Sequence, residues 1–159
     1  MPLYLENQAF GGKAVSLSGL TSSAPLYIGS ASGTKTSDVQ AKAIDMKCAR
    51  KYKDRFFFRI LEVESVTGTG LGYVEFTFYS LATENGAKAT ANSFVKYRVT
   101  KEMLDEAKRS PIEVSVPSTF GRYVRLEVNT DATAAVAGSI LVTIEETPLC
   151  GLRYVTTLG

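Results

Sequence analysis

The sequence predicts an all-β protein: a single antiparallel β-sandwich or jelly roll with one short helix. The aromatic residues are eight Tyr and eight Phe, and Val, Ile and Thr recur throughout, which suits pleated, half-buried surfaces. At least six short segments alternate apolar and polar residues, as half-buried strands do. The connections between these segments are too short for the crossovers that parallel strands need.

Composition limits the classes of protein and partner. The chain has 159 residues, 45% of them apolar and 21% charged, which fits one globular domain. The net charge is +2 with both signs interspersed, so neither nucleic acid nor a membrane surface is expected as a partner. No apolar run is long enough to span a bilayer, the first residues do not resemble a secretory signal, and Cys48 and Cys150 are expected to be reduced thiols.

Three regions follow from composition. Residues 1–38 are rich in Gly, Ser, Thr and Ala, which predicts an extended N-terminal arm with one or two short strands. Residues 39–148 carry the alternating segments and form the sandwich core. Residues 149–159 follow Pro148 and are expected to form a C-terminal arm.

The first half of the core contains three predicted strands. Residues 55–66 favour a strand, the Gly-rich turn at 67–70 closes it, and residues 73–81 form the returning strand of a hairpin. After an Asn85-Gly86 turn, residues 94–99 alternate again. The residues expected to face the core are Val74, Phe76, Phe78, Val95, Tyr97 and Val99.

The second half begins with the only predicted helix, at about residues 101–109. Thr100 is a good N-cap, acidic residues come early, basic residues come late, and Ser110-Pro111 ends the helix. Strands follow at 112–116, 122–128 and 139–145, the first two joined by a short turn around residues 118–121. The residues expected to face the core are Val124, Leu126, Val128, Ile140, Val142 and Ile144.

Little in the sequence suggests catalysis. The chain has no His, so the commonest general base and metal ligand are absent, and we expect no enzyme activity, no cofactor and no metal. Pairs of carboxylates remain possible, because Glu62 and Glu64 should share a strand face and Glu145 adjoins Glu146. Such glutamates on strands are usually solvent-facing.

Two other patterns have ordinary explanations. The glycines at 68–72 lie between two strands and do not open a helix, so they predict a turn and not a phosphate loop. Basic and aromatic residues interleave at 50–56 and 122–125, a pattern that could stack bases. We expect these Lys and Arg side chains to cover the rim of the core instead.

The second half of the chain resembles the capsid cement proteins of tailed bacteriophages. The similarity lies in a Leu-containing helical turn, a short strand ending at Pro, an Arg-Tyr-Val-Arg strand and an Ala/Gly loop before the last strand, in that order. These features occupy Thr100–Arg109, Ile112–Pro117, Gly121–Val128 and Ala137–Val142.

The resemblance implies a jelly-roll protein that binds the outside of an assembled icosahedral shell and clamps neighbouring major capsid subunits together. It also implies a protein made in the host cytoplasm and located on the outer surface of the virion, and a homo-oligomer, dimer or trimer, is expected. Its candidate contacts are Leu3, Tyr4, Leu5 and Phe10 in the N-terminal arm, Leu152 and Tyr154 in the C-terminal arm, and the outward Arg122 and Arg125.

Alternatives remain open at this point. The arm residues could complete the domain's own sheet, and the arginines could pair across strands with Glu113, Glu127 or Glu145. The whole chain could instead be a carbohydrate-binding jelly roll, with Tyr73 and Tyr79 stacking on sugar rings, or a glycosidase that uses only carboxylates.

Overall fold

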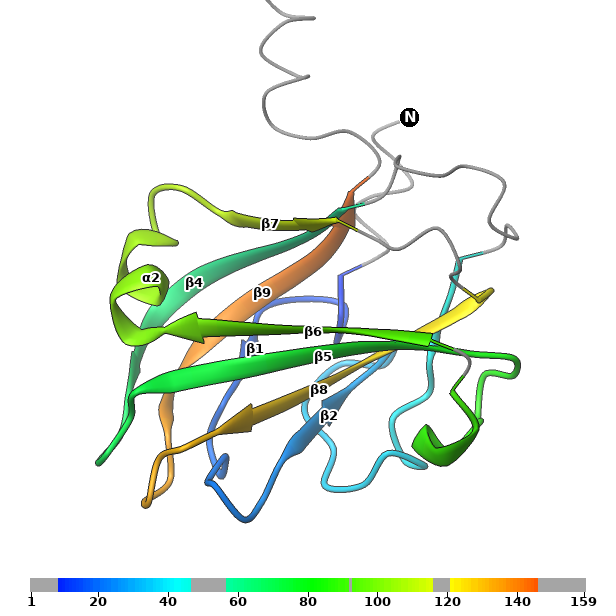
Figure 1. The fold of residues 1–159 in the computed structure, drawn as a ribbon, viewed down its shortest axis with the longest axis horizontal. Coiled ribbons are helices and arrows are strands. Elements are labelled where there is room, and N and C mark those ends of the chain that lie inside the picture. Colours follow the sequence, from blue (N-terminus) through cyan, green and yellow to red (C-terminus); the bar gives the residue numbers. More distant parts are fainter. Residues whose placement is uncertain (1–8, 47–56, 92, 116–120, 146–159) are drawn as a thin grey trace, which may run out of the picture.

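The computed structural model describes residues 9–46, 57–91, 93–115 and 121–145, and these form two antiparallel β-sheets packed face to face (Figure 1). The strands are β1 (Val15–Ser16), β2 (Leu26–Ile28), β3 (Ile44–Asp45), β4 (Phe57–Thr67), β5 (Tyr73–Leu81), β6 (Ser93–Thr100), β7 (Ile112–Ser115), β8 (Tyr123–Thr130) and β9 (Ala137–Glu145). One sheet has the order β1-β9-β4-β7, and the other has the order β2-β8-β5-β6 with β3 also paired to β8. The predicted all-β sandwich is confirmed.

The chain changes sheet at nearly every connection. Among the described strands, only β5 and β6 form a hairpin, while β2 and β3 lie one after the other along β8. Every other step between successive strands joins one sheet to the other. This is the strand order of a jelly roll, in which two four-stranded sheets are built from Greek keys.

The predicted hairpin between residues 55–66 and 73–81 is wrong. Strand β4 pairs with β7 and β9, whereas β5 pairs with β6 and β8, so these two consecutive strands lie in opposite sheets. Their apolar faces meet across the interior, because Phe58 of β4 stacks on Phe78 of β5 with ring centroids 3.8 Å apart. The Gly-rich turn between the strands is therefore a corner between sheets. Strands β7 and β8 also belong to opposite sheets, and residues 116–120 between them lie outside the described residues.

The inward faces agree with the predicted alternation. A third ring, Phe10, lies with its centroid 6.1 Å from Phe58 and 5.8 Å from Phe78. Val95 and Tyr97 of β6 are only half-buried, at the rim of the core. The other predicted inward residues are buried: Val74, Phe76, Phe78, Val99, Val124, Leu126, Val128, Ile140, Val142 and Ile144.

The predicted N-terminal arm is corrected by the structure. The described part of residues 1–38 contains β1 and β2, which pair with β9 and β8 and so belong to the sandwich. Phe10 is 0% exposed, and its backbone N–H donates to the carbonyl of Val142 at 2.8 Å. Most apolar residues of this region are buried, from Ala9 and Phe10 to Leu26 and Ile28, so the sandwich begins at least as early as residue 9. Residues 1–8 and the predicted C-terminal arm at 149–159 lie outside the described residues.

An excursion of the chain, residues 29–43, separates β2 from β3. Ile28 pairs with Leu126 and Ile44 pairs with Val124, so the chain leaves the sheet edge and returns almost to the same place. The two ends of the excursion lie in close contact. As a result, a Cβ on Gly29 would lie 1.8 Å from the carbonyl oxygen of Lys42. Only glycine fits there.

The predicted helix is present but shorter than expected. The helix α2 spans Lys101–Glu106, and the Thr100 hydroxyl accepts a hydrogen bond from the backbone N–H of Met103 at 3.3 Å, as an N-cap does. Residues 107–109 continue only as turns. The other short helical element is a 3-10 turn, η1 (Lys88–Thr90), between β5 and β6.

Replacing Phe58 by Ala should lower the free energy of unfolding by about 3–5 kcal/mol, because the ring joins the two sheets and its loss leaves a cavity. Urea denaturation measures the change. Val63→Ala is the control, since Val63 lies on the same strand but is 46% exposed, and its effect should stay within about 0.5 kcal/mol. Equal effects of the two substitutions would contradict this account of the core.

Candidate functional site

The outer face of the β2-β8-β5-β6 sheet carries a large group of polar side chains. The strand register places these residues side by side on the face that points away from the core. One half of this face is covered by the excursion at 29–43 and the β5–β6 connection at 82–91, and the other half is open. The residues on the face include Tyr73, Glu75, Thr77, Tyr79, Lys96, Arg98, Tyr123, Arg125, Glu127 and Asn129.

Arg125 lies at the centre of the covered half. It points away from the core, as predicted, but it is 0% exposed and so is not a surface contact. Its guanidinium donates to the carbonyl oxygens of Gly86 at 2.8 Å and Glu84 at 3.2 Å. The prediction of Arg125 as an interface residue is wrong, because the β5–β6 connection folds over the side chain.

The two covering segments are also joined to each other. The backbone N–H of Ala43 donates to the carbonyl of Glu84 at 2.9 Å, and the N–H of Lys88 donates to the Asp38 carboxylate at 2.9 Å. A second apolar cluster forms beneath them from Ala43, Tyr79 and Leu81. Burial raises the pKa of Tyr79 well above its ordinary value, although the nearby Arg125 acts in the opposite direction.

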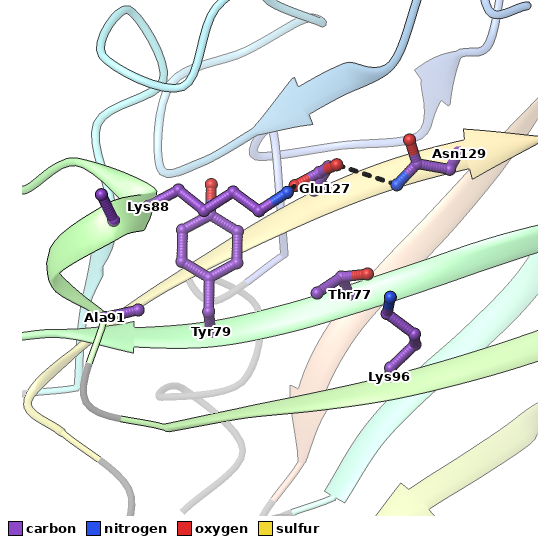
Figure 2. A pocket seen from close by; sticks show the side chains of 8 residues that line it. Thr77, Tyr79, Lys88, Ala91, Lys96, Glu127 and Asn129 are labelled. Atoms are coloured by element: carbon purple, nitrogen blue, oxygen red, sulfur yellow. Dashed lines mark hydrogen bonds and ion pairs between the residues drawn. The ribbon is translucent and has the colours of Figure 1, made fainter. Parts of the chain in front are cut away.

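A hollow of about 290 Å³ lies where the covered half meets the open half (Figure 2). Glu127, at the floor, is almost completely buried and pairs with the Lys88 ammonium at 2.5 Å. The Asn129 amide donates to the other oxygen of the same carboxylate at 2.9 Å. The hollow thus contains polar groups that are already joined to one another. Its lining residues are Thr77, Tyr79, Lys88, Ala89, Ala91, Lys96, Glu127 and Asn129.

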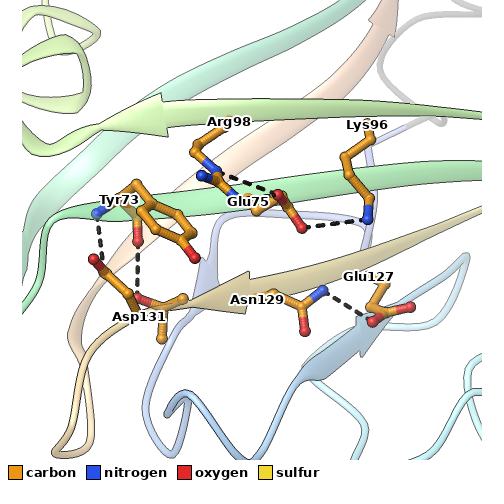
Figure 3. Close-up of polar contacts among 8 residues, drawn as sticks. Tyr73, Glu75, Lys96, Arg98, Glu127, Asn129 and Asp131 are labelled. Carbon is orange, nitrogen blue, oxygen red and sulfur yellow. Dashed lines mark hydrogen bonds and ion pairs between the residues drawn. The ribbon is translucent and has the colours of Figure 1, made fainter.

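The open half is a chain of contacts across β5 and β6 (Figure 3). The Glu75 carboxylate lies 3.1 Å from Arg98 and 3.7 Å from Lys96, so one negative charge forms ion pairs with two positive charges. The Arg98 guanidinium also lies over the ring of Tyr73, 3.9 Å from its centroid. One face of this ring is therefore occupied.

Asp131 fastens the end of this face to the β4–β5 corner. Its carboxylate accepts hydrogen bonds from the backbone N–H groups of Gly72 at 2.9 Å and Tyr73 at 3.0 Å. Burial alone would raise the pKa of Asp131. The backbone hydrogen bonds act in the opposite direction, and the net result is a pKa below the ordinary value.

Arg122 remains at the surface. Its guanidinium makes a two-pronged ion pair with the Asp45 carboxylate, with Nε–Oδ1 at 2.8 Å and Nη2–Oδ2 at 2.9 Å. These hydrogen bonds raise the pKa of Arg122 above its ordinary value. The alternative of pairing across strands therefore holds for Arg122, but with an acid that the sequence did not single out. A role in an interface stays a prediction.

The glutamates proposed as partners of Arg122 and Arg125 are occupied elsewhere. On the outer face of the other sheet, Arg59 lies between Glu113 at 3.0 Å and Glu145 at 3.5 Å. Glu127 pairs with Lys88. The strand alternation identified these residues as outward, but it gave no information about which cation reaches which anion.

The expected shared face of Glu62 and Glu64 is wrong. A β-bulge places two residues of β4 against one of β9, since Glu62 pairs with Ile140 and Glu64 with Ser139. Glu62 lies on the inward face of β4 with Phe58 and Ile60 and is 2% exposed, and its carboxylate accepts a hydrogen bond from the backbone N–H of Val66 at 3.0 Å, whereas Glu64, after the bulge, is exposed. The two carboxylates do not form the pair that a glycosidase mechanism requires.

Several other candidates lie beyond the described residues. They are Leu3, Tyr4, Leu5, Cys48, Glu146, Cys150, Leu152, Tyr154 and the basic segment 50–56. In the second basic segment, residues 122–125, Arg122 is paired with Asp45 and Arg125 is buried, so within the described structure neither arginine is free to stack on a base.

Neither a metal site nor a membrane-spanning helix is found in the described ranges. No three Cys or acidic side chains there gather as a metal site would require. No helix in those ranges has the length and apolar character that crossing a membrane requires.

Comparison with known proteins identifies no family. No protein-family model matches the sequence, and no curated protein matches it significantly.

Replacing Arg125 by Met should loosen both covering segments and lower the free energy of unfolding by about 1–3 kcal/mol, because two carbonyls lose a charged donor. Hydrogen exchange should accelerate at residues 29–43 and 82–91 before it does in β4 or β9. Arg122→Met is the matched control, and its effect should be smaller because its ion pair is exposed. Unchanged exchange in both segments would show that Arg125 does not hold them.

Asp131→Asn should destabilise the protein at pH 7, because an amide accepts the two backbone hydrogen bonds less strongly than a carboxylate does. A lowered folded-state pKa stabilises the protein above the unfolded-state value of about 4, and this stabilisation disappears as the pH falls through the folded-state pKa. The difference between the two proteins in urea denaturation should therefore shrink from pH 7 to pH 3. A difference that stays constant would exclude this role of the carboxylate.

Proposed function

We propose that this chain is a non-enzymatic structural protein of a tailed-bacteriophage head. In this proposal it binds the outer surface of the assembled capsid and clamps neighbouring major capsid subunits, which stabilises the shell. It is made in the host cytoplasm, is carried on the virion and acts as a dimer or trimer.

One observation carries the proposal. The sequence features that resemble cement proteins fall on consecutive elements of one sandwich: the capped helix α2, then β7, β8 and β9. The strand order of that sandwich is the jelly roll that the resemblance implies. The order of motifs in the sequence and the order of elements in the fold thus support the same family.

The polar groups on the described surface are consistent with this role. Arg59, Lys88 and Arg122 are each engaged in ion pairs within the chain. A protein that holds a shell together through many repeated contacts needs no reactive group, because symmetry multiplies weak contacts into strong attachment.

The carbohydrate-binding alternative has less support. Sugar rings stack on exposed aromatic faces, but Tyr79 is 1% exposed and Arg98 covers one face of Tyr73. The two tyrosines that the sequence offered for stacking are thus largely occupied. Specific binding on a glycan array would favour carbohydrate binding over capsid decoration.

Sedimentation with capsids tests the proposal. The purified protein is mixed with mature, empty capsids of a candidate phage from which the natural decoration protein has been removed, and light scattering gives the oligomeric state beforehand. We expect co-sedimentation at a fixed ratio to the major capsid protein, and greater resistance of the decorated capsids to heat. Arg125→Met is unsuitable as a binding variant because its effect is structural, so Arg122→Glu is used to probe the surface. A protein that neither sediments with capsids nor protects them would refute the proposal.

A further inference from the structure

We propose that the outer edge of β6, which no described strand covers, is a docking site for an extended segment of a partner protein in which apolar and acidic residues alternate. This goes beyond the decoration role by naming the edge and the chemistry of the segment. It rests on the proposed function only for the identity of the partner.

The first argument is the backbone of β6. The strand pairs with β5 from Ser93 to Thr100 without a register shift, and no described strand pairs with its other side. The other strands at the sheet edges are shorter: β7 has 4 residues, β2 has 3, and β1 and β3 have 2 each, against 8 in β6. A long regular edge presents unpaired N–H and C=O groups at alternate positions, which an extended peptide can pair with.

The second argument is the apolar rim beneath this edge. Val95 and Tyr97 of β6 face the core but are only half-buried. Met103 of α2 and Ile112 of β7 are also partly buried against the same core cluster. A strand added to β6 would lay its own inward side chains over Val95 and Tyr97, so alternate residues of the partner should be apolar.

The third argument is charge. Lys96 and Arg98 stand on the outward side of β6, with side chains 55% and 57% exposed (Figure 3). Among the described residues, Glu75 holds the one carboxylate in ion-pair distance of either cation, so these ion pairs set two positive charges against one negative charge. Acidic side chains on the outward side of an added strand would stand next to these two cations, which is the favourable cross-strand arrangement.

The same charges argue against a second copy as the occupant. If two β6 strands paired antiparallel about Tyr97, Lys96 of one copy would face Arg98 of the other, twice in each pair. Like charges directly opposite one another destabilise a sheet. In that register the two positive charges oppose pairing of β6 with a second copy, whereas an acidic strand meets no such repulsion.

A peptide of alternating valine and glutamate tests the site directly. Its fluorescence anisotropy is measured with the whole protein, beside three control peptides. One has the same composition in two blocks, one has lysine in place of glutamate, and one is N-methylated at alternate residues so that it cannot pair through that edge. We expect binding of the alternating peptide alone, weakened by salt, with alternate amides of β6 slowed in hydrogen exchange.

Variants locate the site. Lys96→Gln and Arg98→Gln should each weaken peptide binding by about twofold to fivefold, as loss of one exposed ion pair does. Lys13→Gln, at an exposed lysine outside this sheet, should have no effect. Binding of the block or N-methylated peptide as tightly as the alternating one would overturn the proposal, as would full binding to the two β6 variants. A dimer that forms through β6 without peptide would show that the occupant is a second copy and would also overturn it.

Capsid sedimentation with the same variants separates this proposal from the proposed function. Reduced sedimentation of Lys96→Gln and Arg98→Gln, with Lys13→Gln unchanged, would place the capsid contact at β6. Peptide binding without any capsid binding would support the docking edge and refute the decoration role. Capsid binding that is unaffected by both β6 variants, in a protein that fails to bind the peptide, would support decoration and refute the docking edge.

Discussion

The covered half of the outer face of the β2-β8-β5-β6 sheet is organised around one buried positive charge, the guanidinium of Arg125. A buried charge is costly unless hydrogen bonds replace its water. Here the carbonyls of Gly86 and Glu84 do so, and both belong to the segment between β5 and β6. That segment must therefore stay folded over the sheet. It holds the excursion at 29–43 in turn, through Ala43 and Asp38.

This arrangement gives the sandwich a third layer over half of one sheet. Tyr79 and Leu81 would lie on a solvent-facing surface in a bare sandwich, and here they form a second apolar cluster under the covering segments. The hollow beside Lys88 and Glu127 marks the border of that layer. Beyond it the sheet is open, and its charges are arranged as surface pairs. The polar chemistry of the face thus changes where the covering layer ends.

The alternation of apolar residues predicted the strands, their inward faces and the capped helix, because these properties depend on neighbours in the sequence. The pairing of strands depends on contacts far apart in the chain, and there the prediction was less successful. Gly68 to Gly72 could form either a hairpin or a corner, and the choice was made by the stacking of Phe58 on Phe78 across the interior. Phe10 was assigned to an arm for the same reason, since nothing near it in the sequence shows that two other rings surround it. Arg125 illustrates the limit for the site: its outward direction was predictable from the alternation, but the segment that covers it was not.

The distribution of charge between faces and edges bears on how such a sandwich meets a partner. On the outer face of the first sheet, Arg59 is bracketed by two glutamates, and on the second sheet Arg122 and Lys88 each have an acid. These charges are already paired within the chain. Breaking the pairs to bind a partner would cost free energy and so offset part of the free energy gained on binding. Lys96 and Arg98 differ because they share one carboxylate and lie beside a backbone edge with which no described strand pairs. A partner strand can add hydrogen bonds at this edge without first breaking a backbone hydrogen bond between described strands, so among the described edges we expect association at β6 to cost least.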